Sequence, residues 1–276
     1  METRISRRFQ ALSEAGELGL IAYITAGDPS IETTEKIVLS AAGAGADVIE
    51  LGVPFSDPVA DGPTIQRASE RALASGTTLA GVLDLVGHIR ANSEVPIVLF
   101  SYFNPMLQMG LAKFAQAAAR AGADGVLATD LTPEEAGDYR VALEENGLDA
   151  IFLVAPTTTD ARLRAIAKAS SGFLYLISRN GITGAQDVLP ADLPALVRRV
   201  RNFTTLPIAV GFGISQPTHL TVLGGIADAA VVGSALMSEV EKAISPDAAV
   251  SAVAAKISLL KKAARAGVSR RSHDAP

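Results

Sequence analysis

The chain has 276 residues, of which 49% are apolar and 19% are charged, and its 24 basic and 29 acidic residues leave a formal charge of −5. This composition provides for a large core and excludes a disordered chain, and a pI near 5.3 argues against a nucleic-acid-binding surface, which requires a basic stripe. The absence of cysteine excludes disulfides, thiol nucleophiles, iron–sulfur clusters and Cys-ligated zinc.

One unit recurs along the chain: a short apolar run, a turn, and then an Ala-rich stretch with helical periodicity. The apolar runs cover residues 20–26, 47–53, 96–102, 125–130, 150–155, 173–178, 207–211 and 229–233. Runs that are apolar at consecutive positions suit parallel strands covered on both faces. Predicted helices include residues 4–15, before the first strand, and then 31–44, 64–74, 111–121, 133–146 and 160–169. Gly122, Gly147 and Gly172 are expected to end three of these helices.

Eight repeats of strand and crossover helix predict an α/β fold, a (β/α)8 TIM barrel with an extra N-terminal helix. We expect one domain over residues 1–276, with a frayed tail from about residue 270 to the C-terminus. An open doubly wound sheet is the alternative. It would more often show fewer strands and a Gly-x-Gly-x-x-Gly after the first strand, and that motif is absent.

Neither a targeting segment nor a membrane span is predicted. No apolar core follows the arginines of the N-terminus, and the most apolar stretch, residues 226–237, is interrupted by Asp228 and is too short to span a bilayer. We therefore expect a cytoplasmic protein without a membrane partner. No metal is expected, because a three-histidine site would have to combine His88 and His219, both assigned to helix surfaces, with His273 of the polar tail.

The ends of the predicted strands favour carboxylate chemistry. In a barrel, functional residues lie at the carboxyl ends of the strands. The chain's seven lysines all fall in helical stretches, which argues against a Schiff-base lysine there. Glu50 alternates with Ile49 and Leu51 on the second strand and would point into the barrel mouth, where burial raises a carboxyl pKa. A buried Glu held by a structural hydrogen bond is an equal alternative.

The loop after the second strand contains Asp57 and Asp61 among prolines and glycines. Turn formation or helix capping is the ordinary role of such aspartates, and their proximity to Glu50 favours function modestly. Glycine turns after the seventh and eighth strands, around Gly213 and at Gly233-Ser234, suit a phosphate held by backbone amides. Tight turns required by chain closure are the alternative. Residues 178–185 have the composition of a mobile lid or of an ordinary surface loop.

Together these segments resemble the tryptophan synthase α subunit family. Residues 50–62 match its signature, a strand Glu followed by Gly-Val-Pro-Phe-Ser-Asp-Pro and Ala-Asp-Gly-Pro. Residues 178–184, 211–215 and 233–234 follow in family order and spacing, and the similarity extends from about residue 9 to about residue 262. The resemblance implies a carbon–carbon lyase that cleaves indole-3-glycerol phosphate to indole and glyceraldehyde 3-phosphate, with the indole passed on for tryptophan biosynthesis.

The resemblance also implies roles for individual residues. Glu50 would shuttle protons, and Asp61 would stabilise positive charge at the indole nitrogen. The substrate ring and its surroundings would be contacted by Tyr23, Phe100, Leu127, Leu153, Tyr175, Thr183 and Phe212. The phosphate would be bound by Gly184, Gly213, Gly233 and Ser234. Asp57 and Arg179 would serve communication with a β subunit.

The partner implied by the resemblance is the β subunit of an αββα heterotetramer, and pyridoxal phosphate is expected in that subunit, with no cofactor in this chain. Two other interpretations remain open. One is another phosphate-binding barrel of aromatic amino-acid or histidine biosynthesis, such as indole-3-glycerol phosphate synthase, which would need a catalytic lysine at a strand end. A catalytically silent member would only activate a β subunit, although the presence of Glu50 and Asp61 argues against this.

Overall fold

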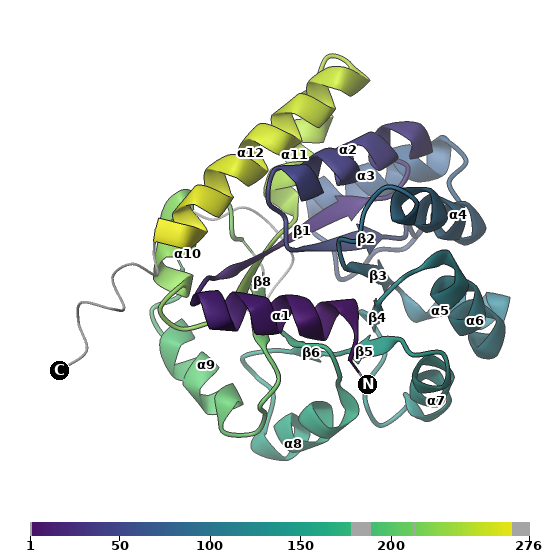
Figure 1. Cartoon of the computed structure of the whole chain (residues 1–276). Helices are drawn as coiled ribbons and strands as arrows, with labels where there is room; N and C mark the ends of the chain where they lie inside the picture. Colours follow the sequence, from purple (N-terminus) through teal and green to yellow (C-terminus); the bar gives the residue numbers. More distant parts are fainter. Residues whose placement is uncertain (1, 178–188, 212, 267–276) are drawn as a thin grey trace.

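The computed structural model describes residues 2–177, 189–211 and 213–266, and its strands form one parallel sheet surrounded by helices (Figure 1). The strands are β1 Gly19–Thr25, β2 Val48–Gly52, β3 Ile97–Ser101, β4 Gly125–Ala128, β5 Asp149–Ile151, β6 Leu153–Val154, β7 Leu174–Ile177, β8 Ile208–Gly211 and β9 Ala229–Val232. The helices are α1 Arg4–Ala15, α2 Ile31–Gly43, α3 Pro63–Ala74, α4 Leu79–Arg90, α5 Phe103–Met109, α6 Leu111–Ala121, α7 Gly137–Glu145, α8 Asp160–Ala169, α9 Leu193–Arg201, α10 Pro217–Leu223, α11 Ser234–Lys242 and α12 Pro246–Ala266.

The sheet closes on itself between β5 and β6. The strand order runs β5-β4-β3-β2-β1-β9-β8-β7-β6, and only Phe152 separates its two ends along the chain. At Phe152 the chain exchanges β4 for β7 as its hydrogen-bonding neighbour, and the Phe152 carbonyl accepts from Tyr175 N at 3.2 Å. The predicted barrel with its N-terminal helix is confirmed. The fifth predicted strand is divided into β5 and β6 because β4 pairs with its first part and β7 pairs with its second part.

Alternation along the strands separates two apolar layers. Ile49 and Leu51 belong to the layer between the strands and the surrounding helices, while Ile21, Val48 and Val98 belong to the barrel interior. All five side chains are fully buried. Burial of each such side chain contributes about 1.5–3 kcal/mol. The inward and outward faces predicted for the second strand are therefore confirmed.

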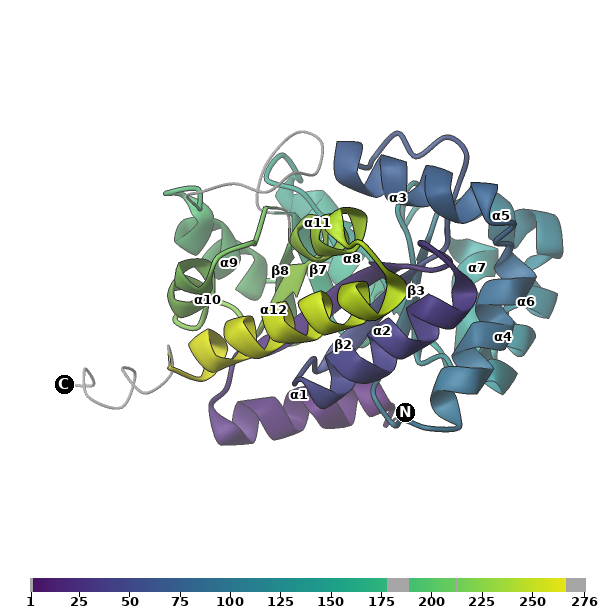
Figure 2. The same cartoon turned by 90° about the horizontal axis from the view of Figure 1, so that it is seen from above.

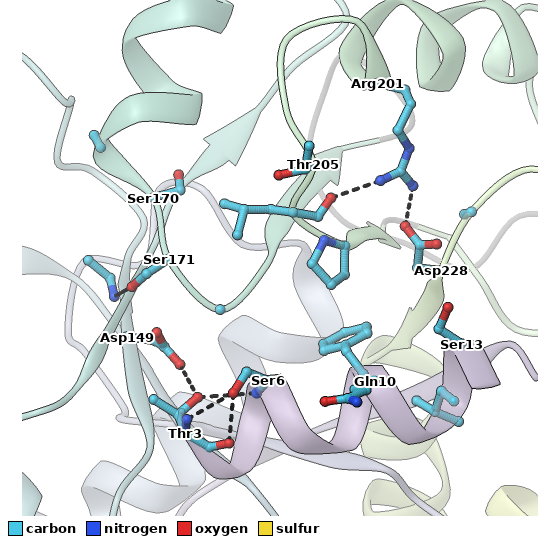
Figure 3. A pocket seen from close by; sticks show the side chains of 18 of the residues that line it. Thr3, Ser6, Gln10, Ser13, Asp149, Ser170, Ser171, Arg201, Thr205 and Asp228 are labelled. Carbon is cyan, nitrogen blue, oxygen red and sulfur yellow. Dashed lines mark hydrogen bonds and ion pairs between the residues drawn. The ribbon is translucent and has the colours of Figure 1, made fainter. Parts of the chain in front are cut away.

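Helix α1 lies across the amino-terminal end of the barrel (Figure 1). Its buried residues Ile5, Phe9 and Leu12 extend the interior layer, and the Phe9 ring packs on Phe173 at 5.6 Å between centroids. Just before α1, the Thr3 hydroxyl donates to Asp149 at 2.7 Å (Figure 3). A cavity of about 940 Å³ lies between this helix and the loops that precede β5, β7, β8 and β9. The helix thus covers the apolar interior at this end, and an open cavity remains between it and these loops.

Aspartates stand directly before several strands and make the same kind of contact with a neighbouring strand. Asp47 precedes β2, Asp124 precedes β4 and Asp228 precedes β9. The carboxylate of each accepts a backbone N–H from the start of the neighbouring strand, at distances of 2.6, 2.8 and 2.7 Å respectively. Cationic side chains pair with all three, from Lys261 and Arg8 on Asp47, Arg90 and Arg4 on Asp124, and Arg201 on Asp228. These contacts satisfy amides that the amino-terminal edge would otherwise leave open.

Two helices separate β2 from β3. Helix α4 packs between α2 and α6 and takes the place of the crossover helix, although residues 79–90 were not among the predicted helices. Helix α3, predicted as residues 64–74, packs instead on α11 and β1. It lies at the end of the barrel opposite α1 (Figure 2).

Several local expectations are refined by the structure. Helix α7 begins at Gly137 rather than at residue 133, because Thr132 and Glu135 form a turn before it. Gly122 ends α6 with a φ of 94°, and Gly147 and Gly172 also take positive φ just beyond α7 and α8. The frayed tail expected from about residue 270 lies outside the described residues.

The two helical histidines differ in their surroundings. His88 is exposed on α4, as expected. The assignment of His219 to a helix surface is wrong: it lies on α10 with 3% of its surface exposed, because this face of α10 turns towards the loop after β8. Within the described ranges, no single helix has the length and hydropathy needed to cross a membrane. Helices α3 and α4 meet that criterion only as a pair, which is bent by 96°.

Candidate active site

A cavity of about 360 Å³ opens at the carboxyl ends of the strands, where barrels carry their functional residues. Its lining brings together eight of the residues singled out from the sequence: Tyr23, Asp61, Phe100, Leu153, Tyr175, Gly213, Gly233 and Ser234. It is completed by Val59, Ala60, Ile65, Thr129, Ile177, Ile214, Val231 and Ala235. These residues give the cavity an apolar wall, one carboxylate and a group of small residues.

Glu50 lies in the barrel interior and is not among the residues that line this cavity. On β2 it pairs in register with Tyr23 of β1, which lines the cavity, and with Val98 of β3, which belongs to the interior layer. The side chain is fully buried, and neither carboxyl oxygen has a hydrogen-bond partner among the described residues. Burial in these apolar surroundings raises the pKa of Glu50 to about 8. The structural hydrogen bond of the alternative interpretation is therefore absent from the described part of the chain.

Asp61 lies on the loop between β2 and α3 and lines the cavity. Only 7% of its surface is exposed, and its carboxylate accepts a hydrogen bond from the Tyr102 hydroxyl at 3.1 Å. Burial raises the pKa of Asp61 to about 6, and the Tyr102 hydrogen bond acts in the opposite direction. At neutral pH Asp61 is mainly ionised while Glu50 is mainly protonated. The two carboxyls are thus suited to different tasks.

Tyr102 was missed by the sequence analysis. It follows β3, and its hydroxyl accepts from Ala60 N at 2.9 Å while it donates to Asp61. Its ring stacks on Phe55, with 5.0 Å between the centroids. A tyrosine at the end of a predicted strand was the available signal, but its contact with a residue 41 positions away required the folded chain.

Aromatic side chains form one wall of the cavity. The Tyr23 ring meets Phe100 edge to face at 5.2 Å between centroids, and Phe100 lies 6.5 Å from Tyr175. Glycines make room for both tyrosines, since a Cβ on Gly52 would lie 2.3 Å from the Tyr23 hydroxyl and one on Gly211 would lie 2.2 Å from that of Tyr175. The wall suits a flat aromatic ligand.

Turns form another part of the cavity lining, and Gly233 lies against the Tyr23 ring. Gly213, after β8, has a φ of 82°, a left-handed conformation that favours glycine. Gly233 follows β9, and α11 begins at Ser234, so the amino terminus of a nine-residue helix lies at the cavity. No lysine or arginine lines the described cavity. Recognition of an anion here would depend on backbone amides and the Ser234 hydroxyl.

The remaining predicted residues lie apart from this lining or were not described. Leu127 is buried in the barrel interior and does not line the cavity. Asp57 is exposed and its carboxylate accepts from the Ser56 hydroxyl. Thr183, Gly184, Arg179 and Phe212 lie outside the described residues. Among the residues that the structure covers, no group of three or more His, Cys, Asp or Glu could hold a metal ion.

Comparison with known proteins identifies the family of the chain. Residues 9–265 match the family model described as tryptophan synthase alpha chain. The chain belongs to the tryptophan synthase alpha chain family. Family membership makes it a lyase that acts on indole-3-glycerol phosphate.

Individual relatives of the family cover most of the chain. Tryptophan synthase alpha chains from Citrifermentans bemidjiense and Solibacter usitatus are 52% and 51% identical to it over 240 residues, 87% of this chain and 90% of each relative. Two solved structures superpose with TM-scores of 0.88. Mycobacterium tuberculosis tryptophan synthase is 34% identical and covers 96% of this chain and 99% of its own, and the Legionella pneumophila subunit alpha is 37% identical, with 95% and 98% covered.

Proposed function

We propose that Glu50 and Asp61 carry out the retro-aldol cleavage of indole-3-glycerol phosphate to indole and glyceraldehyde 3-phosphate. The observation that carries this proposal is the pair of carboxyls with separated pKa values, about 8 and about 6, beside one aromatic-walled cavity. One group can donate a proton at neutral pH and the other can stabilise a cation. Retro-aldol cleavage of an indole substrate needs both.

The cavity orients the substrate in this proposal. The indole ring lies against Tyr23, Phe100 and Tyr175, and the phosphate lies at the turn formed by Gly233 and Ser234. The glycerol chain then extends from the ring to the phosphate. An aromatic wall and a helix amino terminus in the lining of one cavity support this orientation, because each matches one part of the substrate.

Glu50 acts first as an acid and then as a base. Its proton adds to C3 of the indole, and the ring nitrogen takes up the positive charge, which the Asp61 carboxylate stabilises. The Glu50 carboxylate then removes the proton of the hydroxyl on the carbon attached to C3. As the bond between these carbons breaks, its electron pair restores the indole and the O–H electron pair forms the aldehyde. Glu50 ends the cycle protonated, as it began.

We also infer that the chain acts with a β subunit in an αββα assembly, in which indole passes to a partner that carries pyridoxal phosphate. Asp57 belongs to an exposed part of the loop before α3, and Val59, with 79% of its surface exposed, lies two residues further on. An exposed apolar residue beside a charged one at the cavity rim suits a partner surface. Asp57 would then serve communication between subunits, and Arg179, outside the described residues, is assigned the same role by resemblance alone.

Indole release from indole-3-glycerol phosphate tests the catalytic proposal, with and without a tryptophan synthase β subunit. The wild-type chain is expected to turn over, while Glu50→Gln and Asp61→Asn each lose about 10²–10⁴-fold in kcat, the ordinary scale for an acid–base group. Asp57→Ala is the matched carboxylate control, which keeps the isolated rate and weakens only the gain from the β subunit. A wild-type chain that releases no indole even with the partner present would favour the silent member.

The competing synthase interpretation loses support from the lysines. All seven lie on helices, namely Lys36, Lys113, Lys168, Lys242, Lys256, Lys261 and Lys262. None lines the cavity at the strand ends. A Schiff-base or proton-transferring lysine therefore has no position from which to act there.

A further inference from the structure

Helix α3 is an addition to the barrel rather than one of its crossover helices. It begins at Pro63, two residues after Asp61, and packs on α11 and β1 at the end of the barrel opposite α1 (Figure 2). Its buried residues are Ile65, Ala68, Ser69 and Ala72, and all of them except Ile65 have small side chains. So small an apolar face provides little burial to hold the helix in place.

Charged contacts fasten this helix at its far end. The Arg71 guanidinium donates to both carboxylate oxygens of Asp28, at 2.8 Å each, and to Glu241 of α11 at 3.2 Å. Asp28, in the loop after β1, is fully buried. The paired contact is the strong, directional arrangement that a planar guanidinium makes with a carboxylate. Arg71 therefore joins α3 to two other elements of the barrel rim.

Arg67, one turn earlier on α3, makes a contact of a different kind. It pairs with Glu241 alone, at 2.6 and 2.9 Å, and about half of its side chain is exposed. Exposed pairs of this type contribute little to stability. Arg67 and Arg71 thus share a helix and a partner, and only Arg71 reaches the buried Asp28.

The same helix holds the backbone of Asp61. Gln66 on its first turn donates its side-chain amide to the Asp61 carbonyl at 2.8 Å and its backbone N–H to the Gly62 carbonyl at 3.0 Å. Between Gln66 and Arg71 the chain is continuous α-helix, which moves as a unit. A shift of the Arg71 end therefore reaches Asp61.

We propose that Arg71 is a positioning residue for Asp61: by joining Asp28 and Glu241 it holds α3, and through Gln66 the Asp61 backbone, in place at the cavity. The inference rests on the catalytic role proposed for Asp61. It adds a residue that touches neither the cavity nor the substrate. Small displacements of a reacting group can cost about 100-fold in rate, so such a device affects turnover without forming part of the chemistry.

Titration of Asp61 distinguishes positioning from a direct charge effect. Its pKa is raised by burial, so a loosened α3 that admits water would lower that pKa towards its ordinary value. Loss of the Arg71 charge acting at a distance would instead raise it. The titratable groups that interact with Asp61 are Tyr102, Tyr23 and Tyr175, and none of them changes in an Arg71 variant.

The experiment compares wild type with Arg71→Ala, Arg71→Lys and the matched control Arg67→Ala. Indole release is measured across pH, and the Asp61 carboxyl is titrated by ¹³C NMR in aspartate-labelled protein, with its resonance identified by its loss in Asp61→Asn. For Arg71→Ala we expect kcat to fall about 10- to 100-fold and the Asp61 titration to move to lower pH by about half a unit or more. For Arg71→Lys we expect intermediate changes in kcat and in the Asp61 titration, because lysine cannot form the paired contact. For Arg67→Ala we expect both to stay near their wild-type values.

An Asp61 titration in Arg71→Ala that is unchanged or moves to higher pH would overturn the proposal, as would an equal effect in Arg67→Ala. If circular dichroism shows that Arg71→Ala does not fold, Arg71→Lys is used in its place. The same shift of the Asp61 titration to lower pH is then expected of Arg71→Lys. If the wild-type chain has no turnover, the catalytic proposal fails, while the NMR titration still decides whether Arg71 positions Asp61.

Discussion

Glu50 lies in the barrel interior and Asp61 lines the cavity at its mouth, and the two carboxyls differ in their immediate surroundings. Glu50 is enclosed by apolar side chains and receives no hydrogen bond from the described residues, whereas Asp61 receives one from Tyr102. Desolvation raises both pKa values, and the hydrogen bond offsets part of the rise only for Asp61. The Tyr102 hydroxyl thus contributes to the difference between a protonated Glu50 and an ionised Asp61 at neutral pH.

Burial of Glu50 has a measurable cost to stability. Its folded-state pKa of about 8 lies above the ordinary value of 4.5, so ionisation disfavours the folded state as pH rises through this interval, and the full cost is reached above about pH 8. We expect Glu50→Gln to exceed wild type in Tm by about 5 °C at pH 8.5 and to match it at pH 4.5. Thermal melts at the two pH values measure this, and an identical difference at both would contradict a buried, protonated Glu50.

Removing the Tyr102 hydroxyl is expected to shift Asp61 in the other direction. Without this hydrogen bond to the charged form, the pKa of Asp61 rises further, and the acidic limb of the kcat profile moves up by about one pH unit in Tyr102→Phe. The matched control is Tyr139→Phe, which removes a buried hydroxyl that donates to the Val126 carbonyl far from Asp61. An acidic limb that stays in place in Tyr102→Phe would show that the hydrogen bond does not tune Asp61.

At the scale of elements, buried ion pairs join the ends of the chain to the start of the strands. Lys261 on α12 is 3% exposed and donates to Asp47 at 2.7 Å, and Asp47 also holds the Leu20 amide at the start of β1. The two partners are 214 residues apart. This contact therefore fastens the last helix to the first two strands.

Breaking this pair on one side is expected to be costly. In Asp47→Leu the Lys261 ammonium is left buried without its closest carboxylate, which lowers the free energy of unfolding by about 3–5 kcal/mol. The double variant with Lys261→Met recovers part of this loss, because the buried charge is removed too. Glu134→Gln, at an exposed pair with Arg162, is the control and changes stability by less than about 0.5 kcal/mol. Urea unfolding measures all three, and a double variant no more stable than Asp47→Leu would contradict this account.

At the scale of the whole molecule, helix α1 and the proposed active site lie at the two ends of the barrel. Helix α1 lies at the end of the barrel opposite α3 (Figure 2). The cavity with Asp61 opens at the carboxyl ends of the strands, away from α1. The interior layer between them includes Phe9 from α1 and Tyr175 at the cavity. Substitutions of the buried residues under α1 are therefore expected to change the free energy of unfolding more than the rate of indole release.

Phe9→Ala tests this separation. Removal of the buried ring from its contact with Phe173 is expected to cost about 3–5 kcal/mol in unfolding free energy, with kcat at 25 °C within about twofold of wild type. Urea unfolding and indole release are measured on the same preparation. A large loss of kcat in a chain that remains folded would show that the two ends are coupled.

The sequence by itself determined the features that depend on neighbouring residues. Consecutive apolar runs and their turns placed the strands of the barrel, and alternation along one strand placed Glu50 inside it, because side-chain direction follows from local backbone geometry. The same locality explains the correct placement of α6 and α8. The motif around Asp61 and the resemblance to a family were also legible without coordinates.

The tertiary structure alone decided the contacts between distant positions. The Tyr102 hydrogen bond to Asp61, the Arg71 bridge from Asp28 to Glu241, and the burial of His219 on a short helix all join or cover residues that no local pattern relates. The division of the fifth strand at Phe152 has the same origin, since it reflects a change of neighbour from β4 to β7. Such contacts depend on how whole elements pack, and packing is a property of the closed barrel rather than of any segment.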